Sequence, residues 1–200
     1  MSPILYIETN LLVGASKGQD WAEFWEAVRS PIRIALPSVC AMEAMSVFEA
    51  ETRYRLGFIE AMKQHQREAL RDKASDPHAP DLARSLDQAI LRSRKLLNTI
   101  KLRLDAVLEA LAAHADWIPC AERSIRGHLQ RDFPPSPTDK LILTLILNDA
   151  ANRPYVLRAF LSGDAHFGAD EIQDELKRSS IRYFKNMASA LGWLAHPPEA

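Results

Sequence analysis

Short apolar runs alternate with helical segments along the chain, and this alternation constrains the fold more than any other feature. Four runs have the length and apolar character of buried strands, at residues 3–8, 32–36, 155–161 and 181–184. Strands that alternate with helices usually pair in parallel, because a parallel neighbour is reached through a crossover helix. The sequence therefore predicts an α/β fold with a central, mostly parallel sheet covered by helices on both faces.

The middle of the chain is mostly helical. Two helical patterns, at 38–73 and 81–115, flank a break with two prolines at 74–80. Apolar residues recur every three and four positions in the second pattern: Leu82, Leu86, Ile90, Leu97, Ile100, Leu104, Val107, Leu108 and Leu111. We interpret this stripe as packing within the chain rather than as a dimer interface. We expect residues 44–115 to form a helical hairpin, an arm inserted in one domain that spans residues 1–200.

The other face of the second helical pattern is rich in basic residues. Only Asp87 and Asp105 oppose six cations there: Arg84, Arg92, Arg94, Lys95, Lys101 and Arg103. A solvated helix face and a contact with a nucleic-acid backbone explain this pattern equally well.

The composition narrows the class of protein. The formal net charge is −1, which argues against a globally basic nucleic-acid binder and leaves room for a local basic face. We expect Cys40 and Cys120 to be buried, reduced thiols, because both lie in apolar surroundings. No apolar run reaches the roughly 18 residues of a membrane span. The first residues lead directly into a strand, without the pattern of a signal peptide, so we expect a cytoplasmic protein.

Four acids occupy special places relative to the predicted elements. Glu8 follows the first strand, Glu43 lies in the first turns of the next long helix, Asp139 begins an apolar helix, and Asp164 follows the third strand. The carboxyl ends of parallel strands and the helix starts after them share one edge of the sheet. Crowded carboxylates repel unless a cation lies between them. Mg²⁺ and Mn²⁺ prefer such oxygen ligands, so the sequence predicts a metal site suited to phosphodiester hydrolysis.

These acids lie within motifs that have a familiar order. They are Glu8-Thr9-Asn10 after the first strand, Glu43 in the helix after the second, Asp139 at the start of an apolar helix, and Ser162-Gly163-Asp164-Ala165-His166-Phe167 after the next strand. On these motifs the chain resembles the PIN domain, a nuclease family that includes toxin ribonucleases of bacterial toxin–antitoxin pairs. The resemblance covers about residues 1–48 and 117–194. The family usually has Asp-Thr-Asn where this chain has Glu8-Thr9-Asn10.

The resemblance implies a PIN-like three-layer fold and a Mg²⁺- or Mn²⁺-dependent ribonuclease. Glu8, Glu43, Asp139 and Asp164 would hold the metal and form the catalytic set. Thr9, Asn10 and Ser162 would contact the substrate, although Thr9 and Asn10 also suit the orientation of Glu8, and capping of the first helix explains Thr9 equally well. RNA is the implied partner, with an antitoxin protein and a second copy of the chain as further options.

Two other functions follow from the same residues. Glu8 in place of Asp favours, as the alternative, a PIN-like protein with weak or no catalysis that binds nucleic acid or protein through the arm. A nucleotide-binding Rossmann enzyme fits less well, because the chain has no glycine-rich phosphate loop and the polar edge is acidic. Near Asp164 we interpret His166 as an exposed turn residue and Asp170 as a helix N-terminal charge.

Overall fold

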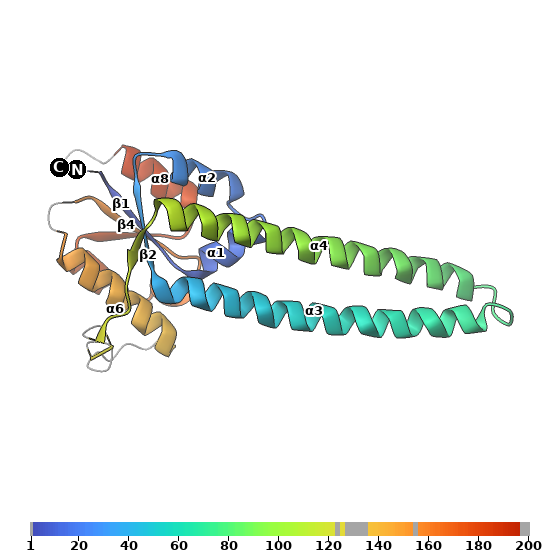
Figure 1. Ribbon diagram of the computed structural model, residues 1–200. Helices are drawn as coiled ribbons and strands as arrows, with labels where there is room; N and C mark the ends of the chain where they lie inside the picture. Colours follow the sequence, from blue (N-terminus) through green and yellow to red (C-terminus); the bar gives the residue numbers. More distant parts are fainter. Residues whose placement is uncertain (1, 123–124, 127–135, 154–155, 197–200) are drawn as a thin grey trace.

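Five parallel strands form a single sheet in the order β3-β2-β1-β4-β5 (Figure 1). The computed structural model describes residues 2–122, 125–126, 136–153 and 156–196. Within the sheet, Leu5 pairs in register with Ile34 on one side and with Ala159 on the other. The strands are β1 (Ile4–Ile7), β2 (Arg33–Pro37), β3 (Asp116–Ile118), β4 (Arg158–Leu161) and β5 (Ile181–Phe184).

Helices cover both faces of this sheet. They are α1 (Thr9–Ser16), α2 (Trp21–Arg29), α6 (Pro137–Ala151), α7 (Asp170–Arg178) and α8 (Met187–Ala195), with a short 3-10 helix, η1 (Ala165–Gly168). Right-handed crossovers place α6 and α7 on one face and α1 and α2 on the other, where α2 packs against α8. Every residue of β1 and β4 is consequently buried, which explains the apolar character of these strands apart from Arg158, the first residue of β4.

Two long antiparallel helices, α3 (Ser38–Asp72) and α4 (Ala79–His114), form a hairpin that extends away from the sheet (Figure 1). We call this pair the arm. The buried residues of α4 are spaced by threes, fours and their sums, as expected for packing of one apolar stripe on a partner helix. They are Ala79, Ala83, Ile90, Ile100, Leu104, Val107 and Leu111.

The arm is tied to the body of the protein at its base. The guanidinium of Arg103 lies 5.6 Å from the ring centre of Trp21, a cation–π contact between α4 and α2. Gly18 has a φ of 91°, and a Cβ there would lie 2.6 Å from an Arg103 nitrogen. Lys17 forms an ion pair with Glu51 of α3 at 2.9 Å. The loop after α1 thus contacts both helices of the arm.

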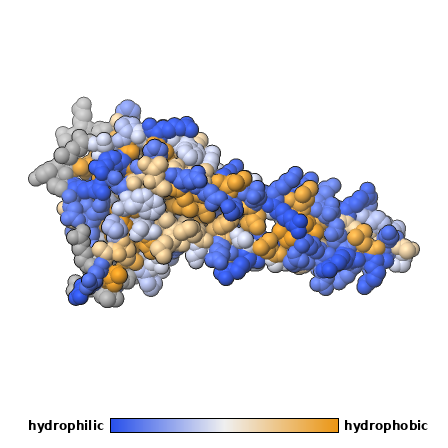
Figure 2. All heavy atoms as spheres, in the orientation of Figure 1, coloured by the Kyte–Doolittle hydropathy of each residue, from blue (hydrophilic) through white to orange (hydrophobic). Residues whose placement is uncertain are grey.

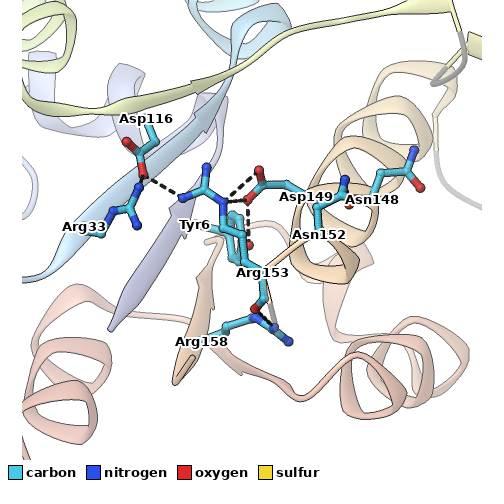
Figure 3. Close-up of polar contacts among 8 residues, drawn as sticks. All are labelled: Tyr6, Arg33, Asp116, Asn148, Asp149, Asn152, Arg153 and Arg158. Carbon is cyan, nitrogen blue, oxygen red and sulfur yellow. Dashed lines mark hydrogen bonds and ion pairs between the residues drawn. The ribbon is translucent and has the colours of Figure 1, made fainter. Parts of the chain in front are cut away.

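A polar network holds the amino edge of the sheet together (Figure 3). Asp116 at the start of β3 accepts from Arg33 of β2 at 2.6 Å and from Arg153 at 2.8 Å. Arg153 also pairs with Asp149 of α6 at 3.0 Å. Asp149 accepts the hydroxyl proton of Tyr6 of β1 at 2.9 Å. The network links three strands to one helix at the edge opposite the four acids.

The predicted α/β class, the parallel pairing and the helical hairpin are confirmed. The sequence offers Thr138 or Ser136 as the cap of α6 and Asn186 as the cap of α8; Ser136 and Asn186 are the caps that form. Most of residues 121–131, where a helix was expected, and of the loop 132–138 lie outside the described part of the chain. None of the described helices is both long enough and apolar enough to cross a membrane.

Three local predictions are wrong. Glu8 caps α1 instead of Thr9, because the longer side chain folds back and accepts the N–H of Asn10. Asp20, which the sequence predicts as the cap of α2, precedes that helix in a left-handed conformation and makes no side-chain cap bond. Cys120 is exposed, since it follows β3 at the surface, whereas Cys40 is buried as expected; both cysteines are free.

Candidate metal centre

The carboxyl edge of the sheet brings together the acids that the sequence singled out. Glu8 follows β1 and Asp164 follows β4, and these strands are hydrogen-bonded neighbours. Asp139 lies in the first turn of α6 and Glu43 in the second turn of α3. All four therefore lie at strand ends or helix starts on the edge where parallel α/β sheets bind ligands.

Glu8 is the buried member of this group, with a relative exposure of 2%. Its Oε2 accepts the backbone N–H of Asn10 at 2.6 Å. Its Oε1 is buried and has no hydrogen-bond partner among the described residues. Burial raises the pKa of Glu8 to about 7, and the Asn10 N–H and the Ser162 hydroxyl offset only part of this effect. The charges of Asp164 and Asp139 raise the pKa further, which shows that both lie near Glu8.

Asp139, Asp164 and His166 come closest to one another. Each offers a ligand atom, and these atoms lie within 4.8 Å of one another. Asp164 accepts the backbone N–H of His166 at 2.8 Å, and its oxygen lies 3.2 Å from Nδ1 of the same residue. Asp139 accepts the hydroxyl proton of Ser136 at 2.8 Å, and its own N–H donates back to that hydroxyl at 3.2 Å. Local hydrogen bonds thus fix both aspartates.

Glu43 reaches the site through Thr9. The Thr9 hydroxyl donates to Glu43 Oε2 at 2.5 Å, a contact between residues 34 positions apart. Cys40 lies one turn before Glu43; burial raises its pKa, and the charges of Glu8 and Glu43 raise it further. Glu43 is outside the group of three that share 4.8 Å. It therefore lies beside the site, with Thr9 between it and the acids of β1 and β4.

The predicted substrate contacts divide into buried and exposed residues. Ser162 is fully buried, and its hydroxyl accepts the N–H of Asp164 at 3.0 Å. Thr9 is also buried and committed to Glu43. Both hydroxyls are thus hydrogen-bonded to residues of the acidic edge, and their contact with a substrate stays a prediction. Asn10 is exposed and remains able to make a direct contact.

Two residues near the acids had no role, or a minor one, in the sequence analysis. Tyr183 of β5 donates its single hydroxyl proton between the backbone oxygens of Ser162 and Asp164, at 3.0 and 3.1 Å. It braces the turn that presents Asp164, and only the register of β5 beside β4 reveals this. His166 is exposed, as expected for a turn residue, yet it lies within ligand reach of Asp139 and Asp164. The feature of the sequence that could have indicated this role is the position of His166 two residues after Asp164.

The donor set fits a hard divalent cation. Several carboxylates converge, one buried oxygen of Glu8 lacks a partner among the described residues, and an imidazole joins at the rim. Carboxylate oxygens are ligands of hard cations, and an imidazole is a ligand of transition metals such as Zn²⁺. Family models, curated proteins and solved structures give no match to this chain. The geometry of the site and the sequence motifs are therefore what bear on function.

Proposed function

We propose that this protein is a metal-dependent ribonuclease of the PIN type, which hydrolyses RNA phosphodiester bonds at the carboxyl edge of its sheet. The observation that supports this most is the convergence of Asp139, Asp164 and His166 within 4.8 Å, beside the unpartnered buried oxygen of Glu8. Repulsion among these acids makes a bound cation favourable. In this proposal the arm, residues 44–115, is an insertion within a PIN-like domain.

The roles of the residues follow from their exposure. Asp139 and Asp164 are half-buried and would hold the cation together with the buried Glu8. Glu43 would contribute from α3, where its Oε2 accepts the Thr9 hydroxyl. Bound Mg²⁺ or Mn²⁺ would stabilise charge on the phosphate and lower the pKa of the attacking water.

His166 has the one exposed imidazole of this edge among the described residues. Its ring nitrogen Nδ1 lies 3.2 Å from Asp164, so the carboxylate orients the ring. The imidazole is placed to give a proton to the leaving oxygen, because it lies at the rim of the acids whose bound cation would hold the phosphate. Its removal is expected to slow cleavage without abolishing metal binding.

RNA cleavage tests the proposal directly. The wild type is incubated with single-stranded RNA, with and without Mn²⁺ or Mg²⁺, beside Asp139→Asn, Asp164→Asn and the control Asp174→Asn. The control makes the same change on the exposed surface of α7. Loss of partners outside the first ligand shell already costs roughly 10–100-fold, so loss of a ligand is expected to cost about 100-fold or more. Cleavage that persists in both site variants would overturn the proposal.

Glu8→Asp tests the substitution that sets this chain apart from the family pattern. Aspartate can still accept the Asn10 N–H, since it is a favoured helix cap. Because the aspartate side chain is shorter, its other carboxylate oxygen would not reach the position of Glu8 Oε1, the oxygen that has no hydrogen-bond partner among the described residues. We expect weaker Mn²⁺ binding, measured as a smaller rise in melting temperature on metal addition. An equal rise would show that the extra methylene does not matter to the site.

A second candidate is a PIN-like binding module that does not cut. Exposed cations and exposed leucines alternate on the middle of α4, where Leu91, Leu96 and Leu102 lie beside Arg92 and Lys95. A surface of this kind suits a macromolecular partner. Retention of RNA or protein without any metal-dependent cleavage would favour this function, and an antitoxin is the kind of protein partner to screen.

A further inference from the structure

A hollow of about 340 Å³ adjoins the candidate metal centre. It lies between α1, with the loop that follows, and the ends of β4 and β5. Two of its lining residues belong to the site loops: Asn10, two positions after Glu8, and Gly163, directly before Asp164. A chain of phosphodiesters with one phosphate at the acids would therefore continue into this hollow.

The uncharged wall of the hollow combines two chemistries. Leu11, Val13 and Leu161 supply apolar surface. Asn10 and Gln19 supply side-chain amides, each with donors and an acceptor. Apolar surface with a few amides suits a nucleobase, whose faces are apolar and whose edges form hydrogen bonds. The volume lies at the small end of the roughly 300–1,000 Å³ range of ligand pockets, as a single nucleotide requires.

Two lysines, Lys17 and Lys185, line the same hollow, against one acid, Asp20. Lys17 pairs with Glu51 at 2.9 Å, but that carboxylate is shared with Arg55 at 2.7 Å. Lys17, Glu51 and Arg55 together therefore carry a net positive charge. Lys185 is exposed and forms no ion pair among the described residues. Cations beside an acidic centre are what a polyanionic substrate needs, because the acids alone would repel it.

We propose that this hollow binds the nucleotide next to the scissile phosphate, with Lys185 contacting the phosphate of that nucleotide. The inference rests on the proposed ribonuclease function. It adds the path of the RNA strand, which runs from the acids past Asn10 and Gly163 toward Lys185. Because the apolar wall contacts the face of the base and not a specific edge, the subsite accepts a base in single-stranded RNA.

The test measures binding apart from cleavage. A fluorescently labelled, single-stranded RNA of about ten nucleotides is titrated onto the full-length Asp139→Asn protein without metal, and the anisotropy is recorded over a range of salt. Lys185→Ala, in the same background, is expected to weaken binding about fivefold and to reduce the salt slope by about 0.7, the value for one phosphate contact on a single strand. Lys185→Arg is expected to retain binding, and Lys177→Ala, on the exposed face of α7, serves as the matched control.

Gly163→Leu fills the hollow from the other side. A Cβ at this position meets no atom within 4 Å, so the larger side chain has room and the melting temperature should stay unchanged. We expect weaker RNA binding, since the side chain occupies the space of the base. If Lys185→Ala and Gly163→Leu both bind RNA as the parent does, the subsite is wrong while the ribonuclease proposal stands. If the Asp139→Asn parent does not bind RNA and the wild type does not cut RNA in the presence of Mn²⁺ or Mg²⁺, both proposals are overturned.

Discussion

The sheet body and the arm bury their apolar side chains in different ways. The body has one continuous cluster that spans both faces of the sheet and reaches the base of α4 through Val107 and Leu111. The outer arm has a separate small cluster of Ile59, Met62 and Ile90. Helices cover the sheet on two sides, whereas in the outer arm α3 and α4 pack mainly on each other. Burial in the body is therefore cooperative, and burial in the outer arm is local.

The surface reflects the same contrast. Hydrophobic side chains show between hydrophilic ones along the whole arm (Figure 2). Most of the exposed large hydrophobic residues lie on α3 and α4: Met42, Met45, Val47, Tyr54, Leu56, Phe58, Leu70, Leu82, Leu91, Leu96 and Leu102. Two antiparallel helices can hide only one stripe each, so apolar residues on their flanks stay in contact with water. The body thus holds most of the buried apolar side chains, while many apolar side chains on the flanks of the arm stay in contact with water.

The largest expected effect is in the centre of the sheet. Phe160→Ala removes a fully buried ring of β4 that packs edge-on against Phe167, with ring centres 5.1 Å apart. We expect a loss of about 3–5 kcal/mol in the free energy of unfolding, measured by urea denaturation. The matched control is Phe58→Ala on the exposed flank of α3, with an expected change within about 0.5 kcal/mol. Equal losses would show that the arm is as tightly packed as the body.

Periodicity predicted most of this architecture. Four of the five strands, the hairpin and the capped starts of α6 and α8 follow from local patterns that tertiary contacts did not override. The fifth, β3, is only three residues long and was not among the predicted strands. The convergence of the acids also follows from the sequence, because parallel strands end at one edge whatever the details of packing. The stripe of α4 was predicted to be internal, and Ile90, Ile100 and Leu104 are indeed buried; Leu82 alone is exposed at 52%.

The details of the site could not be read from the sequence. Glutamate is not a favoured helix cap, so propensity pointed to Thr9 and away from Glu8. The bond from Thr9 to Glu43 joins residues far apart in the chain and depends on how α1 packs on α3. The brace from Tyr183 depends on the register of β5. Side-chain contacts of this kind are set by tertiary packing, which no local pattern encodes.

The next largest effect separates the two regions. Ile59→Ala is expected to lower the stability of the outer arm by about 2 kcal/mol, the low end for such a change, because the thin cluster can relax. The four tryptophans, Trp21, Trp25, Trp117 and Trp193, all lie in the body. Circular dichroism at 222 nm is dominated by the helices of the arm. In Ile59→Ala we therefore expect the dichroism signal to be lost at a lower urea concentration than the one at which the tryptophan fluorescence changes.

Ile172→Ala is the matched change in the body, where the side chain is fully buried on α7. Both signals should shift together in this variant, since the body unfolds as one unit. Coincident transitions in Ile59→Ala would contradict the contrast and show that the arm unfolds only with the sheet.

A smaller effect distinguishes the ion pairs of the two regions. Partial burial raises the pKa of Asp116, but Arg153 and Arg33 outweigh this and hold it below its usual value. A carboxyl with a lowered folded pKa adds stability above its unfolded pKa of about 3.9 and loses it as the pH falls through the folded value. Between pH 5 and pH 3 the wild type should therefore lose about 1 kcal/mol more than Asp116→Asn.

The matched pair on the arm is Lys101 with Asp105, at 2.7 Å and with both side chains about half exposed. Solvent screens such a pair, so Asp105→Asn is expected to leave the acid dependence of unfolding within about 0.5 kcal/mol of the wild type. A larger acid effect for Asp105 than for Asp116 would reverse the comparison.

The smallest expected effect is on the outer flank of α4. Leu91 is 53% exposed, and Leu91→Gln removes little buried surface, so the free energy of unfolding should change by no more than about 0.5 kcal/mol. The result also tests whether a second copy of the chain, one of the possible partners, binds this flank. If a second copy covers this flank, the wild type melts at a temperature that rises with protein concentration, and Leu91→Gln removes that rise. If the flank is free, light scattering gives the same mass for both proteins, and the exposed leucines of the arm do not contact a second copy.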